Sequence, residues 1–336
     1  MELLNAAIVL ANFIVVPALS YGSQLALGAL GVTLIYSVFR FADFAHGDTM
    51  SIATMMAIFV TWWLQAQGVD IAPLPTGLLA IPVAAVGTGI LLLVIDRLVY
   101  RHYRRARAPL ITFVIVSVGV MLMLNGLTRF IIGPGEQRFA DGARFIISAS
   151  EFKQLTGLRE GLAIKTTQVI TFATAWAFMA FLFWFLKFTR TGTAIRAFSD
   201  NEELALLSGI SPKRVVTICW LLVALSATIA GTLYGLDKVY KPFNYFQLLL
   251  PIFAAAVVGG MGSPTGAVLG GYLIAFSEIA ITYAYKRVAG YLLPESWQPE
   301  GLLQLLSTDY KFAVSFGILV VVLIFRPTGL IRGHPG

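Results

Sequence analysis

The chain of 336 residues has 24 Lys and Arg against 17 Asp and Glu, so only 12% of its residues are charged and its formal net charge is +7. A soluble globular chain has about 25% charged residues, whereas here 58% of the residues are hydrophobic and the mean hydropathy is +0.81. This composition excludes an ordinary soluble enzyme, a disordered chain and a nucleic-acid binder, whose basic patch lies on a polar background. The one cysteine, Cys219, excludes a disulfide framework or a CxxC site within one chain.

The charged residues are separated by long apolar stretches. A helix that crosses a hydrocarbon core ~30 Å thick needs about 20 apolar residues. The stretches without Asp, Glu, Lys or Arg are 3–39, 49–69, 71–95, 108–128, 166–186, 215–236, 242–277 and 312–325. Two are too long for one span, and we expect breaks at 17–22 in the first and at 259–264 in the second. The sequence therefore predicts an all-α polytopic membrane protein with about ten transmembrane segments.

Basic residues set the expected orientation. The strongest cluster consists of Arg97, Arg101, Arg104, Arg105 and Arg107. The positive-inside rule places this cluster in the cytoplasm, so that 133–165 lies outside and both 187–214 and the C-terminus lie inside. This alternation allows a parallel internal repeat with halves 1–97 and 215–326, although segments grouped in fours also match by chance. We expect the whole chain, 1–336, to form one transmembrane domain.

Signatures of catalysis and nucleotide binding are absent from the sequence. There is no G-x-x-x-x-G-K-[ST] loop for ATP and no H-E-x-x-H zinc motif. The three histidines, His46, His102 and His334, are far apart in the sequence, and no G-x-S-x-G nucleophile elbow occurs. We therefore expect neither an enzyme nor a metal or cofactor site in this chain.

The first polar interruption, 40–48, contains three ionisable residues close together. Asp43, His46 and Asp48 lie with Gly47 between two apolar segments. Ionisable residues at membrane depth are costly and are candidates for function, which makes these four residues candidates for gating or substrate contact. In the alternative interpretation, Asp48 only caps a helix that starts at Thr49, with Gly47 easing the turn. The sequence leaves both interpretations open.

The second break is rich in glycine and precedes an isolated acid. The candidates for the substrate path here are Gly259, Gly260, Gly262 and Glu278. Glu278 either lines a polar path or pairs with Lys286 and Arg287. Gly266 and Gly270 form a G-x-x-x-G pair, which serves packing within the chain or a dimer seam.

The segment 187–214 is predicted to carry a short helix in the cytoplasm. The spacing Ser199-x-x-Glu202 indicates a capping box, and Gly209 stands where a C′ glycine belongs. Ser211 and Pro212 then begin the next helix, so we expect a short amphipathic helix over about 200–208. Its interpretations are docking to a partner or lying on the lipid headgroups. The residues proposed for docking are Ser199, Asp200, Glu202, Glu203, Leu206 and Gly209.

Four ordered motifs resemble permeases of branched-chain amino acid ABC transporters, the LivH-type subunit. The stretch 41–48, FADFAHGD, is similar to the NFAHGE element of this family, and 192–214 is similar to its cytoplasmic coupling loop. The stretch 257–267, VVGGMGSPTGA, is similar to LGGLGSIPGA, and 325–330, FRPTGL, matches the usual ending. The motifs cover nearly the whole chain, so the resemblance is specific at the level of the family.

Two positions depart from the family pattern, since Asp43 replaces the more usual Asn and Asp48 the usual Glu. The added acid leaves the exact substrate open. Relatives in the same superfamily import urea, short amides or sugars, and the sequence excludes none of these cargoes.

The resemblance implies a multi-pass permease of a bacterial inner membrane that imports small polar solutes, above all branched-chain or other hydrophobic amino acids, by alternating access. It also implies a second permease subunit, two cytoplasmic ATP-binding subunits that hold ATP and Mg, and a periplasmic solute-binding protein. The helix near 200–208 would sit in a groove of the ATPase. From the residues alone, the alternative is a stand-alone secondary transporter or channel with Glu278, Asp43 or His46 as its ion site.

Overall fold

A computed structural model describes the chain except residues 70, 72–73, 140–144, 293–300, 302 and 332–336. Nine of the helices described are long and apolar enough to cross a membrane. The elements that make up these nine spans are α1 (Glu2–Leu10), η1 (Ala11–Val15), α2 (Val16–Phe39), α3 (His46–Ala66), α4 (Gly77–Ile95), η2 (Asp96–Tyr100), α5 (Arg101–Arg105), α6 (Leu110–Ile132), α8 (Thr166–Phe188), α11 (Pro212–Asp237), α12 (Pro242–Gly259), α13 (Pro264–Thr282), η4 (Thr308–Tyr310) and α15 (Lys311–Phe325). The polytopic all-α fold predicted from the sequence is thus confirmed.

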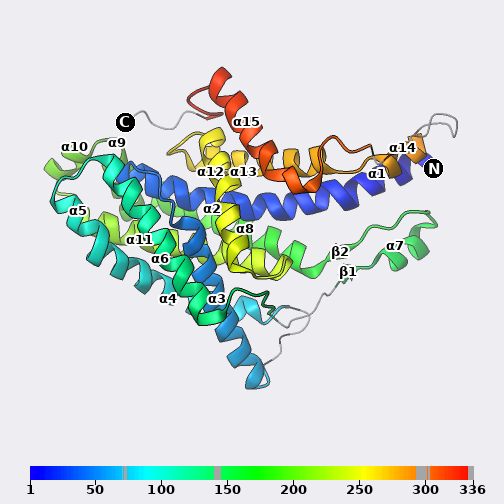
Figure 1. Ribbon diagram of the computed structural model, residues 1–336, viewed down its shortest axis with the longest axis horizontal. Helices are drawn as coiled ribbons and strands as arrows, with labels where there is room; N and C mark the ends of the chain where they lie inside the picture. The colour runs from blue at the N-terminus through cyan, green and yellow to red at the C-terminus, as the bar shows by residue number, and fades with distance from the viewer. Residues whose placement is uncertain (70, 72–73, 140–144, 293–300, 302, 332–336) are drawn as a thin grey trace.

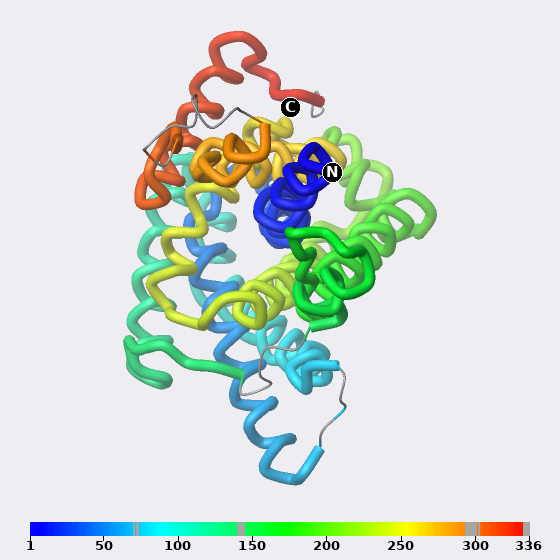
Figure 2. The backbone as a smooth tube through the Cα atoms, turned by 90° about the vertical axis from the view of Figure 1, so that its right-hand side faces the viewer, coloured from blue at the N-terminus to red at the C-terminus, as the bar shows by residue number. Residues whose placement is uncertain are grey.

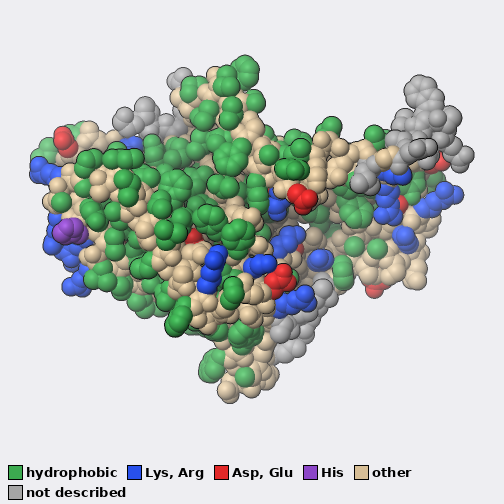
Figure 3. Space-filling model, viewed as in Figure 1, with side chains coloured by type: hydrophobic (Ala, Val, Ile, Leu, Met, Phe, Trp, Pro, Cys, Tyr) green, Lys and Arg blue, Asp and Glu red, His purple; other side chains and the backbone are tan. Residues whose placement is uncertain are grey.

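The shorter elements gather at the two ends of the molecule (Figure 1). They are β1 (Phe145–Ile147), α7 (Ala149–Thr156), β2 (Ile164–Lys165), α9 (Arg190–Asp200), α10 (Glu202–Leu207) and α14 (Lys286–Leu292). α5, α9 and α10 lie at one end, which we call the arginine end, and the antiparallel pair β1–β2, α7, α14 and the N-terminus lie at the opposite end. Figure 3 shows a continuous hydrophobic surface beside the arginine end, with Lys and Arg at both ends and a further group of charged side chains near the middle of the view.

The first long stretch forms one helix, which corrects the predicted break at 17–22. α1, η1 and α2 run without interruption from Glu2 to Phe39. Pro17 lacks an N–H, and its ring would clash with a carbonyl one turn back, but the widened π-type turn η1 comes directly before it and relieves that clash. Gly22 does not turn the chain; it lets Tyr272 approach, since a Cβ there would lie 2.6 Å from the Tyr272 ring.

α2 is the central helix of the fold. Every residue from Ser20 to Ile35 is buried, because α8, α11, α12 and α13 all pack on α2. Figure 2 looks along this helix and shows other helices around it on all sides. A helix that is apolar all round belongs in a core, and the small residues of α2 allow its neighbours to pack closely.

The second long stretch breaks as predicted. α12 ends at Gly259 and α13 begins at Pro264, so 260–263 form a tight connection at the arginine end. The count of nine spans, against about ten expected, follows from the unbroken first helix. The parallel repeat stays a prediction, and its segment correspondence must be redrawn because 3–39 supplies one span and not two.

Candidate functional site

The connection between α2 and α3 is a buried polar turn. α2 ends where Arg40 adopts a left-handed backbone with φ 61°. Within the turn, the Asp43 carboxylate accepts hydrogen bonds from the Ala45 N–H, 3.1 Å away, and from the Tyr100 hydroxyl, 3.2 Å away. Burial raises the pKa of Asp43 to about 6, and these two hydrogen bonds oppose the shift. Asp43 therefore organises the turn and links it to η2.

Asp48 is not the helix cap that one interpretation of the sequence assigned. α3 begins at His46, three residues earlier than predicted, and the Thr49 N–H already donates to the Ala45 carbonyl, 2.8 Å away. Asp48 lies inside this first turn, fully buried, and its carboxylate accepts a hydrogen bond of 2.7 Å from the Asn125 side chain of α6. This pairing between α3 and α6 is not visible in the sequence pattern.

His46 and Gly47 are packed against neighbouring helices. The His46 ring is completely buried between α2 and α11, beside Gly31 and Ser226. Gly47 lies against α12, since a Cβ on it would be 2.8 Å from the Tyr245 carbonyl. The cluster predicted from the sequence thus exists in space, and each of its residues contacts a different helix.

The glycines of the second break allow backbones to touch. A Cβ on Gly259 would overlap the Gly266 backbone, and one on Gly270 would overlap the Ala255 carbonyl. Gly260 and Gly262 have φ of 112° and 82°, values that favour glycine. The G-x-x-x-G pair therefore serves packing of α13 on α12 within the chain.

The C-terminal motif completes this break. The N–H groups of Leu330 and Ile331 donate to the carbonyls of Val258 and Gly259, at 2.8 and 3.0 Å. These carbonyls stand in the last turn of α12, where no helical partner is left for them. The 325–330 motif thus caps the 257–267 motif, a pairing between distant segments that the sequence does not reveal.

Glu278 lies apart from both breaks. Its carboxylate, buried in α13, accepts a hydrogen bond from the Ser315 hydroxyl of α15, with Tyr21 and Lys311 as electrostatic neighbours. Pairing of Glu278 with Arg287 is wrong, because Arg287 forms a two-pronged ion pair of 2.8 and 2.9 Å with Glu160. Glu278 therefore links α13 to α15 through a side-chain hydrogen bond in this conformation.

The docking segment has two helices where one was predicted. α9 includes Ser199 and Asp200, and Asn201 caps α10 by accepting from the Leu204 N–H at 2.9 Å. The predicted capping box at Ser199 is wrong, because the cap residue of α10 is Asn201, two residues later than the pattern suggested. Gly209, with φ 80°, does end α10: its N–H donates to Leu206, and the next N–H donates to Ala205.

The exposed side of α10 is apolar. Ala205 is its one buried residue, whereas Leu204, Leu206 and Leu207 are exposed. Glu202 and Glu203 lie in its first turn, where acids stabilise a helix.

α9 joins both breaks at the arginine end. The Arg40 guanidinium donates to the Ser199 carbonyl, which links α9 to the first connection. A cavity of about 530 Å³ lies between α9 and the second break, with Ser199, Asp200, Gly262 and Ser263 in its walls. The segment 190–207 thus contacts the connection between α2 and α3 and faces the connection between α12 and α13 across the cavity.

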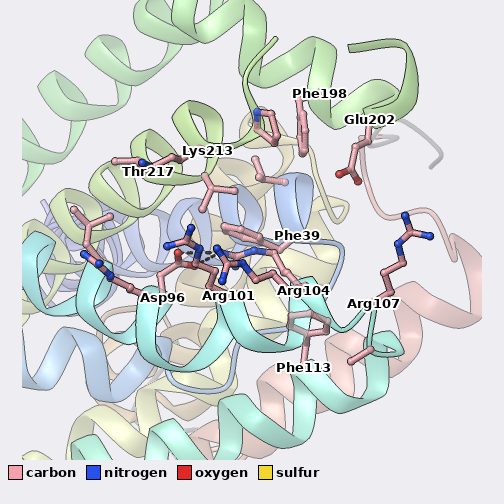
Figure 4. Close-up of a pocket in the computed structure, with 17 residues that line it drawn as sticks. Phe39, Asp96, Arg101, Arg104, Arg107, Phe113, Phe198, Glu202, Lys213 and Thr217 are labelled. Atoms are coloured by element: carbon pink, nitrogen blue, oxygen red, sulfur yellow. Dashed lines mark hydrogen bonds and ion pairs between the residues drawn. The ribbon is translucent and has the colours of Figure 1, made fainter. Parts of the chain in front are cut away.

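A larger cavity of about 870 Å³ lies between α5, α10 and the start of α11 (Figure 4). The Asp96 carboxylate in its wall accepts hydrogen bonds from the Arg104 guanidinium, at 2.7 and 2.9 Å, and from the Trp220 indole N–H, at 2.8 Å. Asp96 was not among the residues predicted from the sequence. The widened turn η2 brings Asp96 to this inward position. The one sequence signal that could have identified Asp96 is its position directly before the arginine cluster.

The family of the chain follows from comparison with known sequences. Residues 14–323 match the model of the family described as branched-chain amino acid transport system, permease component. The chain belongs to this family. The match includes all nine spans in whole or in large part, and members of the family are transport permeases, in agreement with the motifs noted above.

Curated relatives align over nearly their whole length. The permease protein LivH of the Escherichia coli (strain K12) high-affinity branched-chain amino acid transport system is 29% identical over 323 residues, covering 94% of this chain and 92% of LivH. BraD of Pseudomonas aeruginosa, also a permease protein of a high-affinity branched-chain amino acid transport system, is 28% identical over 329 residues. This alignment covers 95% of this chain and 95% of BraD. The LivM permease protein of Escherichia coli (strain K12) is 28% identical over 127 residues, 36% of this chain and 30% of LivM.

Proposed function

We propose that this chain is the membrane-spanning permease subunit of an ATP-driven importer for branched-chain or other hydrophobic amino acids in a bacterial inner membrane. The observation that carries the proposal is the family match over 14–323. The full-length similarity to LivH and BraD, both described as high-affinity branched-chain amino acid permeases, supports the choice of substrate.

The proposed complex contains a second permease, two ATP-binding subunits and an external solute-binding protein. The partial similarity to LivM supports pairing with a related permease, because two chains with shared ancestry can pack around a common axis. ATP and Mg belong to the partner subunits in this proposal. The arginine end, with α9 and α10, faces the cytoplasm in this proposal. The C-terminus, also expected there, lies outside the described residues.

Coupling in this proposal proceeds through α9 and α10. The exposed leucines of α10 enter a groove of the ATPase, and closure of the ATPases moves α9. In this proposal the movement reaches the first connection through the hydrogen bond between Arg40 and Ser199, and the second by closing the cavity between α9 and Gly262. The helix pairs α2–α3 and α12–α13 then tilt together, which opens the path to one side and closes it to the other.

Two measurements test this function. The tagged chain, purified from native membranes, should retain a second permease and ATP-binding subunits. Proteoliposomes with the whole complex, ATP inside and the binding protein outside should take up labelled leucine, and unlabelled leucine should compete whereas urea should not. Replacing Glu202 and Glu203 by Lys should abolish this uptake, whereas Glu136→Lys, in the connection that follows α6, should leave it unchanged. Competition by urea alone would contradict the proposed substrate.

A gradient-driven transporter is the second candidate, because two carboxylates, Asp48 and Glu278, are buried within spans. The chain alone in liposomes distinguishes the two. We expect no leucine uptake under a proton or sodium gradient, and uptake that disappears in Glu278→Gln would favour the second candidate.

A further inference from the structure

We propose that the cavity between α5, α10 and α11 binds the phosphate of an anionic phospholipid from the membrane leaflet at the arginine end. The site goes beyond the transport function proposed above and does not depend on it. Three features of the cavity support the proposal: a surplus of positive charge, one arginine fixed in position, and an apolar wall formed by membrane-spanning helices (Figure 4).

The charge of the cavity is strongly positive. Six bases line it against two acids, Asp96 and Glu202; the bases are Arg97, Arg101, Arg104, Arg105, Arg107 and Lys213. Asp96 is fully engaged by Arg104 and Trp220. Among the described residues, the side chains of the other five bases have no hydrogen bond or ion pair with the protein, so their charge is available to an anion.

Arg104 supplies a preorganised donor. Its Nη2 is held by both oxygens of Asp96, and its guanidinium lies 5.5 Å from the centre of the Phe39 ring. Its Nη1 is buried and has no hydrogen-bond partner within the described part of the chain. A buried donor without a partner is costly, and a phosphate oxygen in the cavity would satisfy it with a charge-assisted hydrogen bond.

The apolar wall argues for a lipid as the source of the phosphate. Val38, Leu93, Phe113 and Val216 line the same cavity, and all four belong to membrane-spanning helices. Near it on the surface, Leu98, Leu110 and Ile111 are exposed by 72, 54 and 64%. A free phosphate or an acidic peptide would use the bases and gain nothing from this apolar surface, whereas a phospholipid contacts the bases with its phosphate and the apolar surface with its acyl chains.

Lipid binding to the purified full-length chain tests the proposal. The chain is titrated in detergent with dioleoyl phosphatidylglycerol or, for comparison, dioleoyl phosphatidylcholine, and bound lipid is counted by native mass spectrometry. We expect preference for phosphatidylglycerol, and Arg101→Gln or Lys213→Gln should each weaken its binding about five-fold, the effect of one base near a phosphate. Arg101→Lys keeps the charge and should bind as the unmodified chain does.

Arg326→Gln is the matched control, since Arg326 is an exposed base outside the cavity. Binding that falls equally in Arg326→Gln, or that shows no preference for phosphatidylglycerol, overturns the proposal. Displacement of the lipid by equimolar soluble glycerol phosphate would show that the cavity takes a free phosphate and not a lipid. Resistance to glycerol phosphate, together with the loss in Arg101→Gln, supports the lipid site.

Discussion

The His46 imidazole occupies the space beside Gly31 that any larger residue would need. A Cβ on Gly31 would lie 2.6 Å from the Nε2 of His46 and 2.9 Å from the Oγ of Ser226. These three residues belong to α2, α3 and α11, so three central helices meet at one imidazole. Neither ring nitrogen forms a hydrogen bond of normal geometry within the described residues, although the Gly28 backbone interacts electrostatically with the ring. The contact between His46 and Gly31 itself is one of packing.

Gly31→Ala should destabilise the chain by about 1–3 kcal/mol, because an added methyl group overpacks this crossing. His46→Ala should impair leucine uptake without loss of expression. The double variant separates packing from chemistry: if His46 acts by shape, Gly31→Ala should recover part of the uptake lost in His46→Ala. Thermal unfolding in detergent and uptake by the reconstituted complex measure both effects, and a double variant as inactive as His46→Ala would assign a chemical role to the imidazole.

The Asp48–Asn125 hydrogen bond should contribute strongly to stability. Asn125→Leu leaves a buried carboxylate without its donor, which costs about 1–3 kcal/mol or more. In an Asp48→Asn background the same change should cost less, because a neutral amide is easier to bury than a charge. Thermal unfolding of the four variants forms a double-mutant cycle, and equal costs in both backgrounds would rule out the proposed pairing.

Asp43 should make stability depend on pH. Burial raises its pKa from 3.8 to about 6, so the folded state holds the proton more tightly than the unfolded state. Stability should therefore fall as pH rises from about 4 to about 6, by up to about 3 kcal/mol, and stay low above that range. Asp43→Asn should remove this fall and raise the unfolding temperature at pH 7.5, while leaving it unchanged at pH 4. A variant that unfolds earlier at pH 7.5 would contradict this account.

Leu207 should be required for coupling to the ATPases. It is 85% exposed on α10, and Leu155 on α7 at the opposite end is equally exposed, which makes Leu155→Ser a matched control. Leu207→Ser should reduce transport-dependent ATP hydrolysis by at least ten-fold, as expected when an apolar anchor is removed from an interface. Leu155→Ser should not change it. Similar rates for the two variants would place the docking surface elsewhere on the arginine end.

The positions of the spans could be predicted from the sequence, because charge is excluded from hydrocarbon regardless of how helices pack. The break at 259–264 was predictable for a similar local reason, since its glycines and Pro264 interrupt any helix. The continuous first helix could not be predicted. Pro17 suggested a break, but the widened turn at 11–15 accommodates the proline within the helix. Whether a helix tolerates proline here depends on the backbone geometry of the preceding turn, which the sequence pattern does not show.

The candidate residues divide in the same way. The segments 41–48, 187–214 and 257–267 could be recognised from the sequence as candidate functional regions, because polar or glycine-rich residues interrupt apolar segments there. The partner of each residue follows from the packing of the helices: Asp48 accepts from Asn125, Glu278 accepts from Ser315, and Arg40 donates to the Ser199 carbonyl. These partners lie 37 to 159 residues away along the chain. Hydrophobic patterning fixes where a helix runs and not which face of it meets which neighbour.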